Sequence, residues 1–218
     1  MGMGIGIGVV IALIVVATLA WWIWRARRMA RAMVILDPRW AVLDLTRESR
    51  SEEIATDQRI LAPILGTPTI SISTPPGADI LFIYGRFDAN GRFANGGAAL
   101  RELIRDSGAK VVVLASDNDP SLLAAAAPNV GYGYANLIVT LERRGSALAT
   151  FLGELFTRMY AGETMPLAWV TLSPQIPGRE EEEDPHTPSV IFLPEAGQLT
   201  FAASTPAPQR RAAAAARG

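Results

Sequence analysis

The chain contains no cysteine, and it has a single histidine and a single lysine among its 218 residues. The absence of cysteine excludes disulfide bonds, thiolate metal sites and cysteine nucleophiles. A histidine metal site or a serine–histidine–aspartate triad would depend on His186 alone. His186 lies beside five consecutive acidic residues, 180–184. We interpret it as part of a solvated linker, with a pH sensor or a metal-binding loop as alternatives.

Basic residues are too few in the main part of the chain for a nucleic-acid-binding surface. Residues 37–195 hold all 21 acidic residues but only 13 basic ones, so this stretch has a net charge of −8. Contacts to phosphate groups require Lys and Arg side chains. The sequence therefore predicts no nucleic-acid partner.

The only long hydrophobic run covers residues 5–24, which are twenty positions without a charge. With a rise of about 1.5 Å per residue, such a helix spans a hydrocarbon core of about 30 Å. Trp21, Trp22 and Trp24 end the run, as is typical of the membrane interface. A cleaved signal peptide is the alternative, but the run lacks a basic n-region and a small-residue cleavage site. We predict one transmembrane helix after a short N-terminus, residues 1–4.

The segment that follows this helix, residues 25–33, is basic. Its charges are all arginines: Arg25, Arg27, Arg28 and Arg31. Positively charged flanks remain on the cytoplasmic side of a membrane. In a bacterium this predicts a single-pass protein of the inner membrane, with its N-terminus outside and its soluble domain in the cytoplasm.

Glycines alternate at the start of the chain. Gly4 and Gly8 are four residues apart and lie on one face of a helix, as do Gly2 and Gly6. Such pairs allow another transmembrane helix to approach closely. The alternative is a frayed helix end. The first interpretation predicts a partner that is itself a membrane protein.

The pattern of residues 34–203 indicates one α/β domain. Strands are predicted at 34–36, 41–45, 69–73, 79–84, 110–115 and 137–141, and helices at 51–61, 98–106 and 146–160. Residues 165–172 fit either a helix or a strand, and 190–193 with 198–202 are expected to form a closing hairpin. Because strands alternate with helices, a mostly parallel central sheet is expected. Two segments read as unstructured, namely an acidic loop (178–187) and a tail (204–218).

The order of these elements is similar to that of a known family. The segments ILFIYGRFDANGRF, KVVVLASDND and VGYGYANLIVTLERRGSALATFLGELFTRMYAGETMPLAW together resemble a CHAT domain, a member of the caspase-like clan of cysteine peptidases. The resemblance covers roughly residues 34–201 and implies a caspase-like fold. In that clan, one buried strand ends in the catalytic His, and the next core strand is followed by the catalytic Cys.

Both catalytic positions of the family are substituted in this chain. The resemblance places Tyr84 at the histidine position and Asn118 at the cysteine position. A carboxamide is not a nucleophile, and a tyrosine with a pKa near 10 is a poor base at neutral pH. The resemblance therefore implies a pseudoenzyme.

A different ligand site could lie at the ends of the predicted strands. Ser116, Asp117 and Asp119 follow the strand at 110–115, and Asp88 follows the neighbouring strand. Carboxylates at this edge of an open α/β sheet could bind a divalent cation. The alternative is that Ser-Asp-Asn-Asp-Pro is an ordinary turn that begins a helix. We predict no cofactor.

The sequence thus favours a membrane-anchored, non-catalytic interaction or structural subunit of a membrane-associated complex. One alternative is a divergent hydrolase that uses the strand-end carboxylates. The other is a regulatory pseudo-protease of the caspase-like class.

Overall fold

The structure is a computed structural model that describes residues 32–46, 51–86, 88, 90–93, 97–119, 121–122, 135–172 and 189–204. Within these ranges, no helix combines the length and the apolarity needed to cross a bilayer. The predicted transmembrane helix (5–24), its glycine pairs and its arginine flank lie outside the described residues. So do the acidic loop, His186 and the tail from residue 205 onwards.

A six-stranded sheet forms the centre of the domain, in the order β3-β2-β4-β5-β6-β7. Its strands are β2 (Trp40–Asp44), β3 (Thr69–Ser71), β4 (Ile80–Tyr84), β5 (Val111–Leu114), β6 (Asn136–Glu142) and β7 (Ser189–Leu193). All neighbours run parallel except β7, which runs antiparallel to β6. The prediction of an α/β domain with a mostly parallel central sheet is confirmed.

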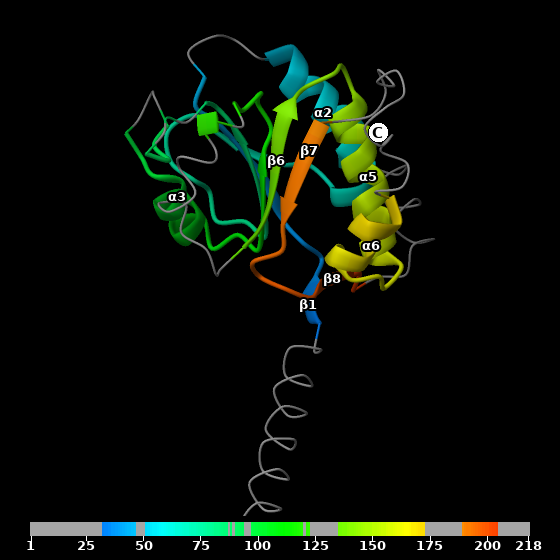
Figure 1. Ribbon diagram of the computed structural model, residues 1–218. Helices are drawn as coiled ribbons and strands as arrows, with labels where there is room; N and C mark the ends of the chain where they lie inside the picture. The colour runs from blue at the N-terminus through cyan, green and yellow to red at the C-terminus, as the bar shows by residue number, and fades with distance from the viewer. Residues whose placement is uncertain are drawn as a thin grey trace, which may run out of the picture.

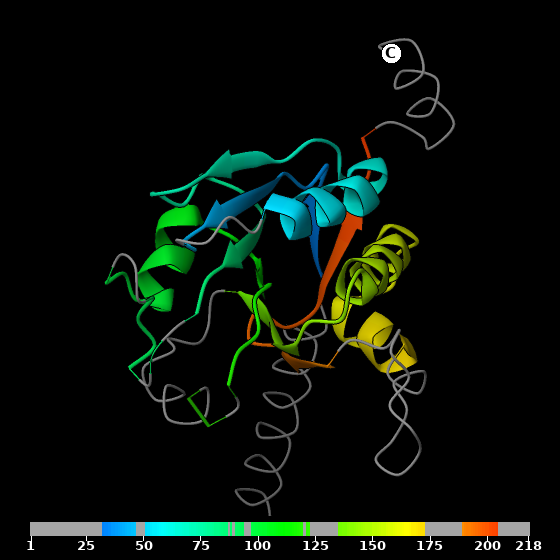
Figure 2. The same cartoon turned by 90° about the horizontal axis from the view of Figure 1, so that it is seen from above.

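Helices cover both faces of this sheet. They are α2 (Ser51–Leu65), α3 (Leu100–Ser107), α5 (Ala147–Tyr160) and α6 (Met165–Leu172). Successive strand residues point to opposite faces, so Phe82 packs in the core below α2 and α5, while Ile83 packs in the core below α3. Figure 2 shows α3 on one side of the sheet and α2 and α5 on the other. Because β4 and β5 are covered on both faces, every residue in them is buried.

A second, two-stranded sheet joins the two ends of the domain. In it, β1 (Met33–Leu36) runs parallel to β8 (Leu199–Ala202). The predicted hairpin of 190–193 with 198–202 is therefore wrong, because β7 pairs with β6 instead. Asn136 holds the turn between β7 and β8 in place. Its side chain accepts a hydrogen bond from Ala196 N at 2.9 Å and donates one to Gly197 O at 3.2 Å, and this fixes the turn against the start of β6.

Two predictions about helices are resolved by the structure. Residues 165–172 form a helix, α6. The helix predicted at 51–61 instead continues through Pro63 to Leu65. Pro63 removes one backbone hydrogen bond and its ring disfavours the regular helix, but the helix continues for two residues beyond it. Gly66 ends it, with a φ of 82° and a hydrogen bond of 2.8 Å from its N–H to Ala62 O.

The parallel strands give the sheet a direction. We call the edge where β2, β4, β5 and β6 end the carboxyl edge, and the opposite edge the amino edge. In Figure 1 the arrow of β6 points away from the end of the molecule where β1 and β8 lie. The carboxyl edge and the two-stranded sheet are therefore at opposite ends of the domain.

Candidate functional site

Tyr84 is the last residue of β4, and its side chain is fully buried. Its hydroxyl donates a hydrogen bond to the Asp57 carboxylate. Asp57 is also buried, on the face of α2 that carries Ile54 and Leu61. Those residues are three positions before it and four positions after it, so all three share one helix face. A carboxylate therefore lies within an otherwise apolar, core-facing stripe.

Arg143 follows β6 directly and compensates the charge of Asp57. Its Nη2 lies 2.5 Å from Asp57 Oδ1, and the side chains of the two residues are 4% and 1% exposed. Its Nη1 donates to Ala115 O at 2.9 Å. We call Tyr84, Asp57 and Arg143 the buried network. It connects α2 to the ends of β4, β5 and β6.

Further contacts of Arg143 strengthen this connection. Its backbone N–H donates to Asp117 Oδ1 at 2.6 Å. Its guanidinium carbon lies 5.8 Å from the centre of the Tyr84 ring. Its Nε lies 3.6 Å from the Glu53 carboxylate, one helical turn before Asp57. A single arginine thus holds four segments of the chain together.

Burial sets the direction of the pKa shifts of the two acidic members of the network, Asp57 and Tyr84. It raises the pKa of Asp57 above its usual value, although the hydrogen bond and the charge of Arg143 act in the opposite direction. Burial also raises the pKa of Tyr84 well above its usual range, and the neighbouring charge of Asp57 adds to this rise. The tyrosine hydroxyl therefore stays protonated at neutral pH and acts as a hydrogen-bond donor.

Asn118 joins β5 to β6. Its side-chain nitrogen donates to Ser116 O at 2.6 Å and to Thr140 O at 3.0 Å. Its backbone N–H also donates to Thr140 O, at 3.0 Å. Both hydrogens of the carboxamide are thus used to satisfy buried backbone carbonyls. An asparagine fits this place because its short amide can bond the backbone on both sides.

Ser116 and Gly85 close the gap between β4 and β5. The Ser116 hydroxyl oxygen accepts a hydrogen bond of 2.9 Å from Gly85 N, and Ser116 is fully buried. A Cβ atom on Gly85 would lie 3.2 Å from both the Leu45 and Phe93 side chains. A larger residue after Tyr84 would therefore require the Leu45 and Phe93 side chains to move by a few tenths of an ångström.

The two exposed carboxylates singled out in the sequence each belong to a local turn. Asp88 accepts hydrogen bonds from Arg92 N at 3.0 Å and Asn90 N at 2.8 Å, and these bonds lower its pKa. Asp119 accepts hydrogen bonds from the hydroxyl and backbone N–H of Ser121, which lower its pKa in the same way. These contacts are those of turn and helix-start residues.

The structure therefore brings only part of the predicted ligand edge together. Asp117 binds the Arg143 backbone, Ser116 binds Gly85, and the other two acids bind their own turns. Over the described part of the chain, no three Asp, Glu or His side chains are grouped so that they could hold a metal ion.

Sequence reasoning missed Asp57 and Arg143. A signal for Asp57 was present, since an acidic residue interrupts the apolar spacing of Ile54, Leu61 and Leu65 on α2. Arg143 carried no comparable signal. Its burial depends on packing between α2 and the end of β6, which are 86 residues apart at the ion pair.

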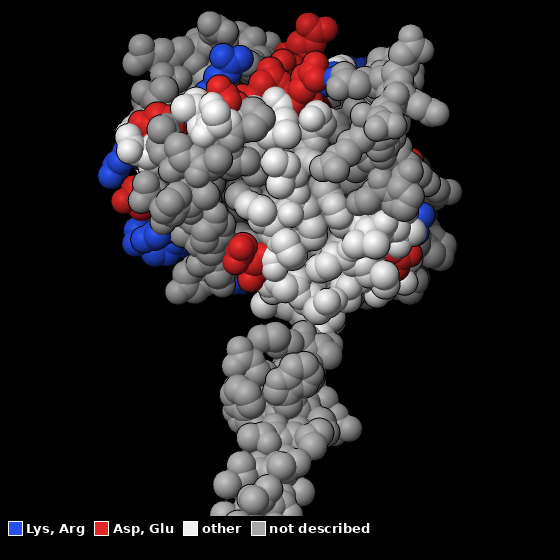
Figure 3. Space-filling model, in the orientation of Figure 1, with Lys and Arg blue, Asp and Glu red and all other residues white. Residues whose placement is uncertain are grey.

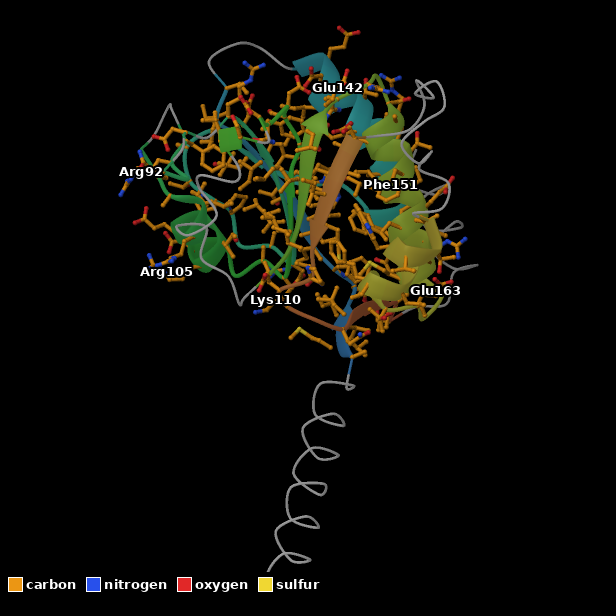
Figure 4. The ribbon with its side chains drawn as sticks, in the orientation of Figure 1. Arg92, Arg105, Lys110, Glu142, Phe151 and Glu163 are labelled. Carbon is orange, nitrogen blue, oxygen red and sulfur yellow. The ribbon has the colours of Figure 1, made fainter. Side chains whose placement is uncertain are left out.

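Acidic side chains gather at this end of the molecule. Figure 3 shows them at the end where β6 terminates, above a largely uncharged central face. Figure 4 places Glu142 there, whereas Lys110 and Glu163 lie toward the opposite end. On the face that Figure 3 draws, acidic side chains are therefore visible near the carboxyl edge.

No protein-family model matches this chain, and no curated protein matches its sequence. The resemblance to a CHAT domain therefore remains a prediction from the sequence.

Proposed function

We propose that the chain is a membrane-anchored, non-catalytic interaction subunit of a membrane-associated complex. In this proposal residues 5–24 hold the domain at the membrane, and the carboxyl edge of the sheet is a rigid structural element. The partner is another membrane protein or a subunit of the same complex.

One observation carries the proposal. The two residues that the resemblance aligns with a catalytic dyad, Tyr84 and Asn118, are both used to hold the sheet edge together. The amide hydrogens of Asn118 bond backbone carbonyls, and the Tyr84 hydroxyl bonds Asp57. Burial keeps the Tyr84 pKa far above neutrality. These contacts support a structural role for positions where a peptidase of that clan would carry its chemistry.

The fold is compatible with the caspase-like resemblance. The order of the parallel strands, β3-β2-β4-β5-β6, corresponds to the 2-1-3-4-5 order of flavodoxin-like sheets. Many unrelated functions use such sheets. A regulatory pseudo-protease, with its partner in a signalling pathway, is therefore kept as an alternative to the proposed interaction subunit.

Affinity purification of the full-length protein from native membranes in mild detergent tests this function. The variant Tyr84→Phe removes one hydroxyl from the buried network. Tyr160→Phe is the matched control, because Tyr160 packs against Phe201 with ring centres 5.4 Å apart and is outside the network. We expect the same co-purifying proteins with wild type and both variants.

The same preparations should be assayed for peptide, ester and phosphate hydrolysis, to test the hydrolase alternative. Loss of the hydroxyl–carboxylate bond should lower the free energy of unfolding by about 1–3 kcal/mol without abolishing binding. A hydrolytic activity that Tyr84→Phe removes while the protein stays folded would overturn the non-catalytic assignment. Co-purification of no protein at all with the wild type would contradict the interaction role.

A further inference from the structure

Strand β1 presents apolar side chains to solvent. Met33, Val34 and Leu36 are 44%, 59% and 61% exposed. Ile35, between them, is buried and packs in the core. Val34 and Leu36 share one face of the strand because side chains alternate along it. Single exposed apolar residues are normal on a protein surface, whereas β1 exposes three of them within four positions.

This strand is at one end of the domain. Among the residues that the structure describes, β1 pairs with β8 alone. Figure 1 shows both strands at the end opposite to the arrowhead of β6. The exposed side chains of β1 therefore belong to the end of the domain opposite to the buried network.

The position of β1 in the sequence indicates what covers it. Met33 comes nine positions after Trp24, the last residue of the predicted membrane span. Nine residues reach about 14 Å as a helix and at most about 32 Å when fully extended. The interfacial and headgroup region of a bilayer adds about 5–7 Å on each side of its hydrocarbon core. Strand β1 is thus the first described element beyond the anchor and lies within a short reach of the lipid.

We propose that β1 rests on the bilayer that holds the anchor, with Met33, Val34 and Leu36 in the interfacial region of the lipid. This inference rests on the membrane anchor of the proposed function. Apolar side chains at the interface gain free energy by leaving water. The charge nearby is mixed, because Arg39 and Asp79 precede strands at this edge. The Nε of Arg39 lies 3.9 Å from Asp79 Oδ2, and the Arg39 backbone N–H donates to the same oxygen at 2.9 Å. Among the described residues, the apolar side chains of β1 therefore make this contact.

The orientation has a consequence for the complex. With β1 against the lipid, the parallel strands run away from the membrane. The carboxyl edge, with its buried network and acidic surroundings, then faces the aqueous phase. A soluble or peripheral partner would meet that edge, whereas a partner within the membrane would contact the anchor.

Site-specific fluorescence tests the contact, and the cysteine-free chain makes labelling simple. Val34→Cys and Leu36→Cys report on β1. Ile72→Cys is the control, because Ile72 is an apolar residue, 77% exposed, that follows the carboxyl end of β3. Each full-length variant would carry an environment-sensitive dye and be reconstituted into vesicles of phosphatidylcholine and phosphatidylglycerol. Spin-labelled lipid and aqueous iodide would serve as the two quenchers.

We expect the labels at positions 34 and 36 to be quenched by the spin-labelled lipid and to lose most of their quenching by iodide. The label at position 72 should behave in the opposite way. Thermal unfolding of each variant would show that the fold is kept, as expected for substitutions at exposed positions.

The outcomes separate this inference from the anchor itself. If carbonate extracts the protein from the vesicles, the anchor fails, and with it the proposed function. If the protein stays inserted but iodide quenches positions 34 and 72 equally, the lipid contact is overturned while the anchor stands. If position 34 is shielded from both quenchers, protein covers β1, either another part of this chain or a second copy, and the lipid contact is likewise overturned.

Discussion

At the residue scale, Arg143 is the centre of the domain's polar structure. It satisfies the buried charge of Asp57 and a backbone carbonyl at the end of β5. A buried ion pair of this kind adds little net stability, because desolvation offsets the attraction between the charges. Its effect is to fix which elements meet, since the loss of one partner leaves the other charged and buried.

We expect Arg143→Met to lower the free energy of unfolding by about 3–5 kcal/mol, because the Asp57 carboxylate would remain buried without a cation. Urea unfolding followed by circular dichroism measures this loss. The same substitution at the next residue, Arg144→Met, is the control. Arg144 bonds the exposed Glu142 at 2.7 Å, so little change is expected.

Adding Asp57→Asn to Arg143→Met should recover part of the stability, because the uncompensated charge is then gone while Tyr84 keeps an acceptor. A double variant that is less stable than Arg143→Met alone would show that charge burial is not the cause of the loss.

The raised pKa of Asp57 should make its contribution to stability fall as the pH rises. The pKa of Asp57 is raised on folding, so the folded state binds a proton more readily than the unfolded chain. Its contribution to stability is fully present below the unfolded pKa of about 3.9 and is lost as the pH rises through the higher folded pKa. We expect Asp57→Asn to remove this fall of stability with rising pH.

The contribution of Asp88 to stability should depend on pH with the opposite sign to that of Asp57. Hydrogen bonds from Arg92 N and Asn90 N lower the pKa of Asp88, so its contribution is present above the unfolded pKa and is lost as the pH falls through the folded one. Chemical unfolding of wild type, Asp57→Asn and Asp88→Asn between acidic and neutral pH measures both slopes. If the two substitutions change the slope of stability against pH in the same direction relative to wild type, the assignment is contradicted.

At the scale of elements, the contact between α2 and α5 depends on a glycine. A Cβ atom on Gly153 would lie 3.3 Å from the end of the Ile64 side chain and 3.9 Å from Ile60. A methyl group needs only a small movement of a flexible side chain, whereas a longer side chain has no room. The close approach of the two helices therefore requires a small residue at this position.

We expect Gly153→Leu to lower the free energy of unfolding by about 1–3 kcal/mol through overpacking. Gly153→Ala should be close to neutral, since alanine favours the helix by about 1 kcal/mol and this offsets the tight contact. Glu154→Leu, at the exposed neighbouring position, is the control for adding a leucine to α5. Differential scanning calorimetry would compare the three. An unchanged melting temperature for Gly153→Leu would mean that the helices can separate freely.

At the scale of the whole molecule, the sequence predicts attachment to the membrane and orientation. We expect the full-length protein to stay in the membrane fraction after high salt and carbonate, because screening weakens ionic contacts but cannot displace twenty apolar residues. A reporter protein that is active only in the cytoplasm should be active when it is fused after Gly218, and one that is active only outside the cytoplasm should be inactive there. Recovery of intact protein in the soluble fraction would contradict the prediction of a membrane anchor. Digestion of the domain by protease added to intact spheroplasts would contradict the predicted cytoplasmic location of the domain.

A second prediction at this scale concerns the anchor's partner. Changing Gly4 and Gly8 together to Leu would fill the groove between two packed helices, while membrane insertion should be kept because apolarity rises. We expect normal membrane targeting with a weakened complex, measured by co-purification in mild detergent. Unchanged recovery of every partner would indicate that the soluble domain, and not the glycine face of the anchor, binds the partner.

The sequence by itself determined the layer architecture and most elements. Strands such as ILFIY and VVVL are apolar throughout because both faces of a central parallel strand are buried, and that pattern is local. The apolar spacing of α5 was equally visible. The Asn90-Gly91 pair favours a turn through its local chemistry, and the structure shows Gly91 with a φ of 72°.

Only the tertiary structure decided which strands pair and which polar residues meet. The pairing of β8 with β1 joins residues about 166 positions apart, and adjacency in the sequence wrongly suggested a hairpin with β7. The buried network likewise depends on α2 packing over the ends of three strands. Local patterns reveal which side of an element faces the core, but they carry no information about the distant element that it meets there.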